Sequence, residues 1–325
     1  MPEAAAVVVE RTRDVAHGDY ASNVAMRLAK AVGMEPREVA QAIVLALPPS
    51  PLVAKTEVAA NGFINFFLAP AALAHEVRRI HELGDTYGRS SIGTGKQMRV
   101  GLLTNARDVL HARYVAYSDS LANLLVAVGY DVQRTGLADA PAFQNVTFYR
   151  GNVGTQVATL RALREEVGDD ACRFFFLMRS HEQSLDFDLK LVATRTIDNP
   201  LFAVQYAHAR VASAMKEVKA RGISFDLAAG LRTLERLDKG TERTLITALL
   251  RFPEEVESAA ANCAPHSIVY YLREVATAFH TYYAAEQWIV EDVDLRNARL
   301  ALVLAAGQVI RNGLALIGVS APESM

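Results

Sequence analysis

The sequence predicts a mainly helical, multidomain protein with a small α+β unit, a short α/β segment and a C-terminal all-α bundle. From Leu160 onward, apolar residues recur at helical spacing, as at Ile268 and Leu272. Two strand-like runs at 98–104 and 131–133 flank a helix pattern and form one strand–helix–strand unit. Near the N-terminus, two helix patterns precede two β-prone runs. We therefore expect three segments, residues 1–83, 84–155 and 156–325.

The N-terminal segment carries the signals of two helices and a hairpin. An amphipathic helix pattern starting near His17 ends at Gly33, a residue type that commonly closes helices. A second helix pattern begins at Pro36 and stops at Pro48, because proline cannot continue a helix. The Asn-Gly pair at 61–62 is a strong turn signal between two β-prone runs. These signals together predict an α+β module.

The middle segment predicts only a small sheet. After a helix at 71–83, residues 84–95 are rich in glycine and serine, which indicates a linker. One strand–helix–strand unit cannot cover both faces of a parallel sheet, and from 140 to 155 the apolar pattern gives way to polar residues. The sheet is therefore either very small or completed by neighbours. Farther along, we expect Asp186 and Asp188 in a solvated turn.

The composition is that of an ordinary soluble globular protein, with 51% hydrophobic residues and a net charge of −2 over 325 residues. This charge disfavours a protein that coats nucleic acid non-specifically, but it allows a shaped RNA-binding surface with local arginines. No apolar run approaches the ~20 residues of a membrane span, and no basic segment precedes the first apolar run. Cys172 and Cys263 lie far apart in apolar helical patterns, which favours buried thiols in a reducing compartment. We expect a cytoplasmic protein without a metal site.

The C-terminal half resembles the anticodon-binding domain of arginyl-tRNA synthetases, which are class I synthetases. The motifs that carry this resemblance follow the family's order and are EEVGDDACRFFFLMRS, LDFDLKL, DNPLFAVQYAHAR, TAFHTYY and LIGVSAPESM. The first unit resembles the family's additional N-terminal domain through GDYASNVAMRLAK and NGFINFFL. The resemblance covers nearly the whole chain. It implies an anticodon-binding bundle and, between the two domains, a remnant of the nucleotide-binding α/β catalytic fold.

The family's first catalytic signature, His-X-Gly-His, is degraded here. Asp108 stands at the first histidine, Leu110 at the glycine and His111 at the second histidine. Leu110 adds a side chain where the family's backbone approaches ATP, and Asp108 places a carboxylate where phosphate charge would lie. We interpret Asp108 and His111 as relict positions. For His111, ordinary surface or cap-region chemistry is the favoured alternative.

The second signature, a Lys-Met-Ser-Lys-type loop, has lost its lysines. No lysine occurs between Leu110 and Ala171, and Arg150 is the one cation in FYRGNVGTQVATL. The family's long catalytic middle is also absent, because TGLADAPAFQNVT leads from the second strand almost directly to this loop. We therefore predict no catalytic residue, no cofactor and no synthesis of arginyl-adenylate by this chain alone.

The resemblance places candidate tRNA contacts on the helix that begins at Pro200. Tyr206 falls where the family presents an aromatic side chain to the anticodon loop, and stacking on an unpaired base is a common mode of RNA recognition. Asn199, Gln205 and Arg210 are weaker candidates. The alternative for Tyr206 is a tyrosine that holds the bundle together, and Asn199 has an alternative role as a helix cap.

Further candidates match the N-terminal domain and the C-terminus of the family. The part that approaches the tRNA elbow is matched by Asp19, Tyr20 and Asn23, and its neighbouring strand by Phe63 and Asn65. Ordinary packing is the alternative for Phe63, as is a satisfied helix polar group for Asn23. At the C-terminus, Met325 matches the family, but serine at 324 replaces an arginine and removes an expected phosphate contact.

The sequence therefore predicts a catalytically inactive arginyl-tRNA synthetase-like protein that binds tRNA of the arginine type, free or charged. Presenting or sequestering that tRNA for a partner enzyme is the associated hypothesis. Two alternatives remain open. One is a protein-interaction subunit that uses the bundle as a docking surface, and the other is a repurposed enzyme that acts with arginyl-tRNA or a nucleotide. The oligomeric state is left open.

Overall fold

The computed structural model describes residues 7–12, 15–103, 106–137, 144–157 and 159–325. By compactness the chain divides into two units, residues 1–76 and 77–325. The three segments expected from the sequence, with boundaries after 83 and 155, stay a prediction. Part of the stretch from Ala140 lies outside the described residues.

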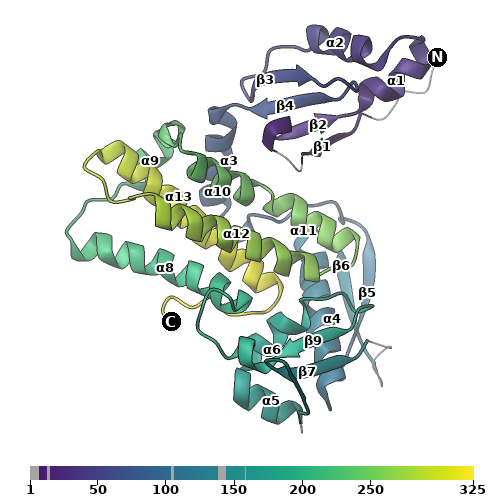
Figure 1. Ribbon diagram of the computed structural model, residues 1–325, viewed down its shortest axis with the longest axis vertical. Coiled ribbons are helices and arrows are strands. Elements are labelled where there is room, and N and C mark those ends of the chain that lie inside the picture. Colours follow the sequence, from purple (N-terminus) through teal and green to yellow (C-terminus); the bar gives the residue numbers. More distant parts are fainter. Residues whose placement is uncertain (1–6, 13–14, 104–105, 138–143, 158) are drawn as a thin grey trace. The chain divides into compact units, whose positions relative to one another are not determined.

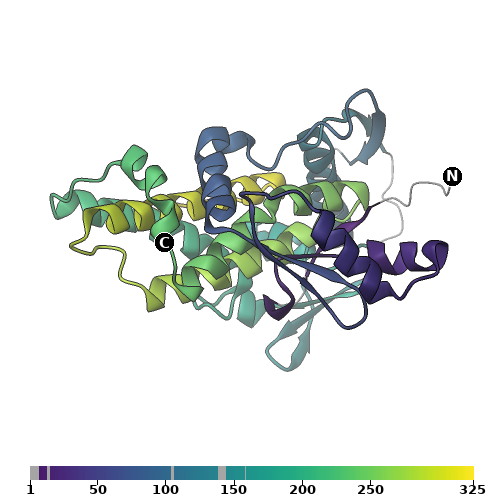
Figure 2. The same ribbon diagram turned by 90° about the horizontal axis from the view of Figure 1, so that it is seen from above.

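The first unit is a four-stranded antiparallel sheet in the order β1-β2-β4-β3, with two helices packed on it (Figures 1 and 2). The apolar faces of both helices meet Ile64 in one small core. The expected hairpin is present, but residues 20–22 form a strand and not the start of the first helix, because they pair with β1 and β4. The elements are β1 Val9–Arg11, a 3₁₀ turn Val15–His17, β2 Tyr20–Ser22, α1 Val24–Val32, α2 Pro36–Ala46, β3 Val53–Val58 and β4 Ile64–Leu68.

In the second unit, the strand–helix–strand segment forms a parallel sheet of two strands, β5 Gln97–Leu102 and β6 Asp131–Gly136, joined by α4 Val109–Ala127. The small sheet expected from the sequence is therefore confirmed. Every residue of β6 except Val132 is exposed. The strand thus carries a polar surface, unlike the buried strands of a doubly covered parallel sheet.

A second small sheet corrects two expectations. The polar stretch before residue 155 forms a hairpin of β7 Val146–Arg150 and β8 Val153–Thr155, and β9 Leu185–Asp188 pairs in parallel with β7. Asp186 and Asp188 therefore lie on a strand and not in a free turn. Phe187 between them is fully buried, and its ring lies 5.4 Å from that of Phe148. This long-range pairing overrides the local turn signal.

The segment expected as a linker packs tightly on the bundle. It follows α3 Pro70–Leu83 and begins with a 3₁₀ turn at Gly84–Thr86. Tyr87 is only 1% exposed, and its ring stacks on Phe252 at 6.1 Å. Gly88 has φ +94°, and a Cβ there would lie 2.4 Å from the Phe252 ring. Glycine at 88 therefore allows the backbone to approach the Phe252 ring closely and does not mark a flexible linker.

The rest of the second unit is the predicted helical bundle. The helices α8, α12 and α13 lie side by side and contact one another (Figure 1). By length and composition α13 could cross a membrane, but 72% of its apolar window is buried, which makes it a core helix. Cys172 is buried as expected, whereas Cys263 lies in a turn with φ 50°. The helices are α5 Leu160–Val167, α6 Asp169–Phe176, α7 Leu189–Val192, α8 Pro200–Ala220, α9 Leu227–Arg232, a 3₁₀ turn Leu234–Arg236, α10 Gly240–Leu250, α11 Phe252–Ala261, α12 His266–Ala285 and α13 Val293–Leu316.

Candidate nucleic-acid interface

Tyr206 belongs to a row of rings and a guanidinium on α8 and α12. Its half-buried ring stacks on Phe202 at 5.3 Å, four residues back on the same helix. The Arg210 guanidinium lies over the Tyr206 ring at 4.4 Å and over the Tyr283 ring at 4.7 Å. His280 lies 5.8 Å from Tyr206, and its Nε2 is 2.9 Å from the Ala203 carbonyl oxygen. Partly exposed rings beside a cation are the kind of surface on which unpaired bases stack in RNA-binding proteins.

We call this group the aromatic row, and its members are Phe202, Tyr206, Arg210, His280 and Tyr283. The sequence predicted two of them as site residues, Tyr206 and Arg210. Phe202, four residues before Tyr206, follows from helical spacing alone. His280 and Tyr283 come from α12, about seventy residues away, so no local pattern links them to α8. Burial lowers the pKa of His280, so this ring is a neutral neighbour of Arg210 near pH 7.

Asn199 and Gln205 are engaged inside the fold and not grouped with the exposed rings. Asn199 is 4% exposed, and its Oδ1 accepts hydrogen bonds from the N–H groups of Leu201 and Phe202. Its Nδ2 donates to the carbonyls of Val192, the last residue of α7, and of Thr194 in the loop that follows. Asn199 is therefore the cap of α8, as the alternative interpretation held.

Gln205 holds the C-terminal tail. It is 8% exposed, and its Nε2 donates to Asp170 Oδ2 at 3.1 Å and to the Ser320 carbonyl at 3.0 Å. On the same helix, His208 Nδ1 lies 2.8 Å from the Pro322 carbonyl oxygen. Beyond these anchors Met325 is 54% exposed. The residues next to Tyr206 thus position the tail, while the terminal residue remains accessible.

In the first unit, three of the five predicted residues line one hollow of about 320 Å³. They are Asn23, Phe63 and Asn65, and the sequence prediction missed the neighbouring Asn61 and Arg11. Asn23 begins α1, but its side chain makes no cap bond, and its buried Oδ1 has no hydrogen-bond partner among the described residues. A buried acceptor without a partner is costly, so it favours a ligand that donates a hydrogen bond there.

The two remaining residues of that prediction support the strands around the hollow. Asp19 Oδ2 accepts a hydrogen bond from the Leu68 N–H at 2.7 Å and so fixes the end of β4. Tyr20 lies on β2, with the Arg11 guanidinium 4.6 Å from its ring centre. Arg11 itself lines the hollow, so Tyr20 contributes to the hollow indirectly, by holding the Arg11 guanidinium.

Asp108, the residue that the resemblance matches to the family's first catalytic histidine, caps its own helix. Asp108 is the N-cap of α4, and its Oδ1 accepts a hydrogen bond from the His111 N–H at 2.9 Å. Its Oδ2 lies 2.8 Å from His111 Nδ1, although without the geometry of a hydrogen bond. The hydrogen bond from the His111 backbone holds the pKa of Asp108 below its ordinary value. A helix N-terminus is an anion site, and here the anion is built in.

Two other cations of the middle segment are engaged within the fold. Arg113 is 1% exposed and donates hydrogen bonds to the carbonyls of Gln144, Ser180 and Gln183. Arg150 is paired with Glu166 at 2.5 Å. Among the described residues, no group of three or more histidine, cysteine, aspartate or glutamate side chains is placed to hold a metal ion.

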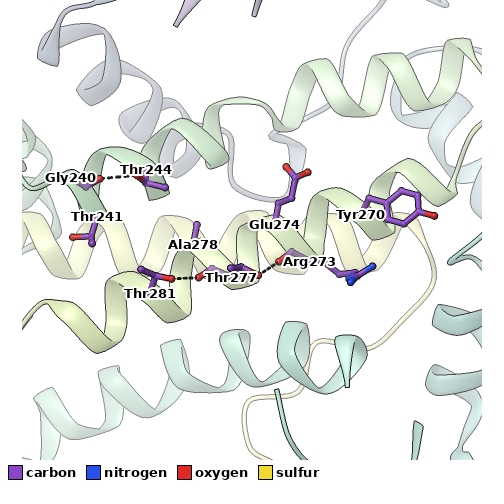
Figure 3. A pocket seen from close by; sticks show the side chains of 9 residues that line it. All are labelled: Gly240, Thr241, Thr244, Tyr270, Arg273, Glu274, Thr277, Ala278 and Thr281. Atoms are coloured by element: carbon purple, nitrogen blue, oxygen red, sulfur yellow. Dashed lines mark hydrogen bonds between the residues drawn. The ribbon is translucent and has the colours of Figure 1, made fainter. Parts of the chain in front are cut away.

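A hollow of about 850 Å³ lies between α10 and α12, and no predicted site residue lines it (Figure 3). The Thr244, Thr277 and Thr281 hydroxyls donate to carbonyls one turn back on their own helices. Arg273 and Glu274 are its charged members. The hollow therefore offers shape but no nucleophile–base pair.

Comparison with protein families identifies both ends of the chain. The model described as "DALR anticodon binding domain" matches residues 204–325. The model described as "Arginyl tRNA synthetase N terminal domain" matches residues 1–68. The first region contains Tyr206 and Met325, and the second contains the hollow around Asn23 and Asn65.

Related chains and structures agree with these matches. The arginine–tRNA ligase of Thioalkalivibrio sulfidiphilus is 29% identical over 557 positions, which cover 98% of this chain and 95% of that one. Because this chain has 325 residues, part of that relative has no counterpart here. The ligase of Legionella pneumophila strain Corby is 43% identical over 225 residues, or 67% of this chain and 38% of its own.

Two solved structures share the fold. The arginyl-tRNA synthetase of Thermus thermophilus matches with a TM-score of 0.75 at 15% identity, covering 100% of this chain and 97% of that one. The enzyme of Plasmodium falciparum matches with a TM-score of 0.73 at 10% identity, covering 100% and 96%.

Proposed function

The chain belongs to the arginyl-tRNA synthetase family, and from this premise we propose that it binds tRNA but does not activate arginine. The family binds tRNA through the anticodon-binding domain, which is matched here by residues 204–325. The aromatic row supports retained binding, because Tyr206 offers a partly exposed ring that Phe202 and Arg210 hold in place. The proposed ligand is a tRNA of the arginine type, free or charged.

Asp108 is the single observation that carries the loss of catalysis. Amino-acid activation needs donors that stabilise charge developing on the ATP phosphates. The N-terminus of α4 is the natural donor at this position, but the Asp108 carboxylate already accepts one of its free N–H groups, that of His111. A phosphate placed there would meet a negative charge in place of a donor.

Two further features support a chain that functions without a catalytic middle. The Arg150 guanidinium, the one cation at the second signature, is paired with Glu166 at 2.5 Å, so a phosphate there would have to displace a carboxylate. The exposed polar face of β6 is suited to water, whereas a larger parallel sheet would bury that strand. In the sequence, the remnant lies between the two regions that match tRNA synthetase domains, and its proposed role is to connect them.

The proposal is tested by two measurements on the full-length chain. Filter-binding titration should show tighter binding to arginine tRNA than to other tRNAs or to random RNA of equal length. Arginine-dependent exchange of pyrophosphate into ATP, with tRNA present, should stay at background. Equal affinity for every RNA would refute the binding half, and measurable exchange would refute the catalytic half.

A second candidate function is a protein-interaction subunit, and the hollow between α10 and α12 favours it (Figure 3). Its wall carries threonine methyls and Ala278 beside Arg273 and Glu274, which suits a helix or loop of a partner. Sequencing the RNA that copurifies from native cells separates the two functions. Absence of enriched tRNA, with a stoichiometric protein partner, would favour docking.

A further inference from the structure

Two hollows of the second unit share the lining residue Arg311, and together they are called the groove. One measures about 590 Å³ and lies among the segment after α3, the end of α4, β6 and α13. The other measures about 540 Å³ and lies among α3, α8, α13 and the C-terminal tail. Arg311 of α13 lines both of them. Neither hollow contains Tyr206 or the relict position Asp108.

The groove concentrates positive charge in a chain whose net charge is −2. Arg89 and Arg134 line the first hollow, Lys216 and Lys219 line the second, and Arg311 joins the two. All five side chains are exposed. The carboxylates that line the groove are those of Asp85 and Glu323, so cations predominate.

Three of the five cations are available for a ligand. Arg89, Lys216 and Lys219 have no ion pair among the described residues. The other two are engaged at exposed positions. Arg311 Nη2 donates to Gln308 Oε1 at 2.5 Å and lies 3.4 Å from Asp85. Arg134 Nη2 donates to Asn123 Oδ1 at 3.3 Å, and its Nη1 lies 3.9 Å from Asp119. Exposed pairs of this length contribute little, so these side chains can turn to a stronger anion.

The groove floor is fixed by hydrogen bonds. Asn312 Nδ2 donates to the carbonyls of Gly84 and Tyr87 at 2.9 and 3.1 Å. Gln308 Nε2 donates to Asp85 Oδ1 and to Asn312 Oδ1, both at 2.8 Å. These bonds hold the segment after α3 against α13. The exposed cations therefore stand on a floor that hydrogen bonds fix, and Arg311 is tied to it through Gln308 Oε1. Such a surface suits contacts to the phosphodiester backbone, which do not read the bases.

We propose that this groove binds the phosphodiester backbone of the tRNA, apart from the aromatic row that contains Tyr206. A single phosphate needs one cluster of donors, whereas here cations line two hollows that share Arg311. Cations spread over two hollows suit several phosphates of one backbone better than a single anion. The inference rests on the proposed function, because a tRNA held by the same unit brings its phosphates near at high local concentration.

The test compares the salt dependence of tRNA binding in two double variants of the full chain. Arg89→Ala with Lys219→Ala removes one unpaired cation from each hollow. Arg161→Ala with Arg232→Ala is the control, because it removes the same net charge from exposed sites outside the groove. Kd for arginine tRNA is measured from about 0.05 to 0.3 M salt. Each lost phosphate contact should lower the slope of log Kd against log salt by about 0.7–0.9.

The groove variant should therefore lose about 1.5 from the slope, while the control keeps the wild-type slope. An unchanged slope in the groove variant, or an equal fall in both, would overturn the groove assignment. So would a polyglutamate peptide that binds the wild type as tightly as tRNA at the same ionic strength and loses affinity in the groove variant alone. If the wild type binds no tRNA at any salt, the proposed function itself fails, and the slopes are not compared.

Discussion

Replacing Tyr206 with alanine is the most direct perturbation of the proposed RNA contact. The ring is half-buried and contacts Phe202, Arg210 and His280, so its loss removes both a stacking surface and the support of the cation. Ring pairs contribute about 0.5–1.5 kcal/mol, and an exposed cation–π contact contributes about 0.5–1 kcal/mol. The folding cost should therefore be about 1–2 kcal/mol, which a unit with a large core tolerates.

The effect on RNA should be distinct from this folding cost. Stacking of one base on an aromatic side chain contributes about 1–3 kcal/mol, so Kd for arginine tRNA should rise about 5- to 150-fold. Tyr206→Phe keeps the ring and should stay within about 3-fold of the wild type. Titration is done well below the unfolding temperature of each variant, with circular dichroism recorded on the same samples.

Tyr130→Ala is a matched control, because Tyr130 is also a half-buried ring beside a cation, with Lys96 Nζ 5.8 Å from its centre. It should leave Kd unchanged. An unchanged Kd in Tyr206→Ala, or an equal loss in Tyr130→Ala, would refute the assignment of Tyr206 as a base-stacking residue. It would favour the alternative in which Tyr206 only holds the bundle together.

Two predictions concern stability. Glu242 is fully buried and accepts a hydrogen bond from Arg299 Nε at 2.8 Å. Glu242→Gln should therefore lower the free energy of unfolding, measured by urea titration, by about 3 kcal/mol. Arg161→Ala breaks an exposed ion pair and is the control, with an expected loss below about 0.5 kcal/mol. Burial lowers the pKa values of His81, His266 and His280 in the folded chain. As the pH falls below 6.5, the unfolded chain therefore binds more protons at these histidines than the folded chain does, and this favours unfolding. The urea midpoint should hence decrease from pH 7 to pH 5, and His81→Gln should reduce that decrease; a flat profile would contradict it.

The parts of the fold that could be predicted are those with local signals. Helical spacing gave α12 through Ile268 and Leu272, and the Asn-Gly pair at 61–62 gave the turn between β3 and β4. The pairing of β9 with β7 joins residues about forty positions apart, and no local pattern encodes such a contact. The packed segment around Gly88 was missed for a related reason, since a glycine signals both a flexible linker and a close approach.

The candidate site divides in the same way. The resemblance could place Tyr206 on α8, but it could not show that Asn199 and Gln205, on the same helix, face inward. Burial depends on what covers a helix, and here the covering elements are the end of α7 with its following loop, the start of α6 and the C-terminal tail. The groove around Arg311 had no sequence signal, because its cations come from separate elements and the net charge is negative.

Whether both units engage the same tRNA molecule can be decided by combining Tyr206→Ala with Asn65→Ala. Asn65 is 6% exposed and lines the hollow of the first unit. If one tRNA contacts both residues, the two contacts act on one complex, so their fold-losses in affinity should multiply in the double variant. Asn152→Ala, an exposed asparagine between β7 and β8, should change nothing in either background. If the double variant binds no more weakly than Tyr206→Ala, or if two tRNAs bind per chain, the units act separately, and a single tRNA is not shared between them.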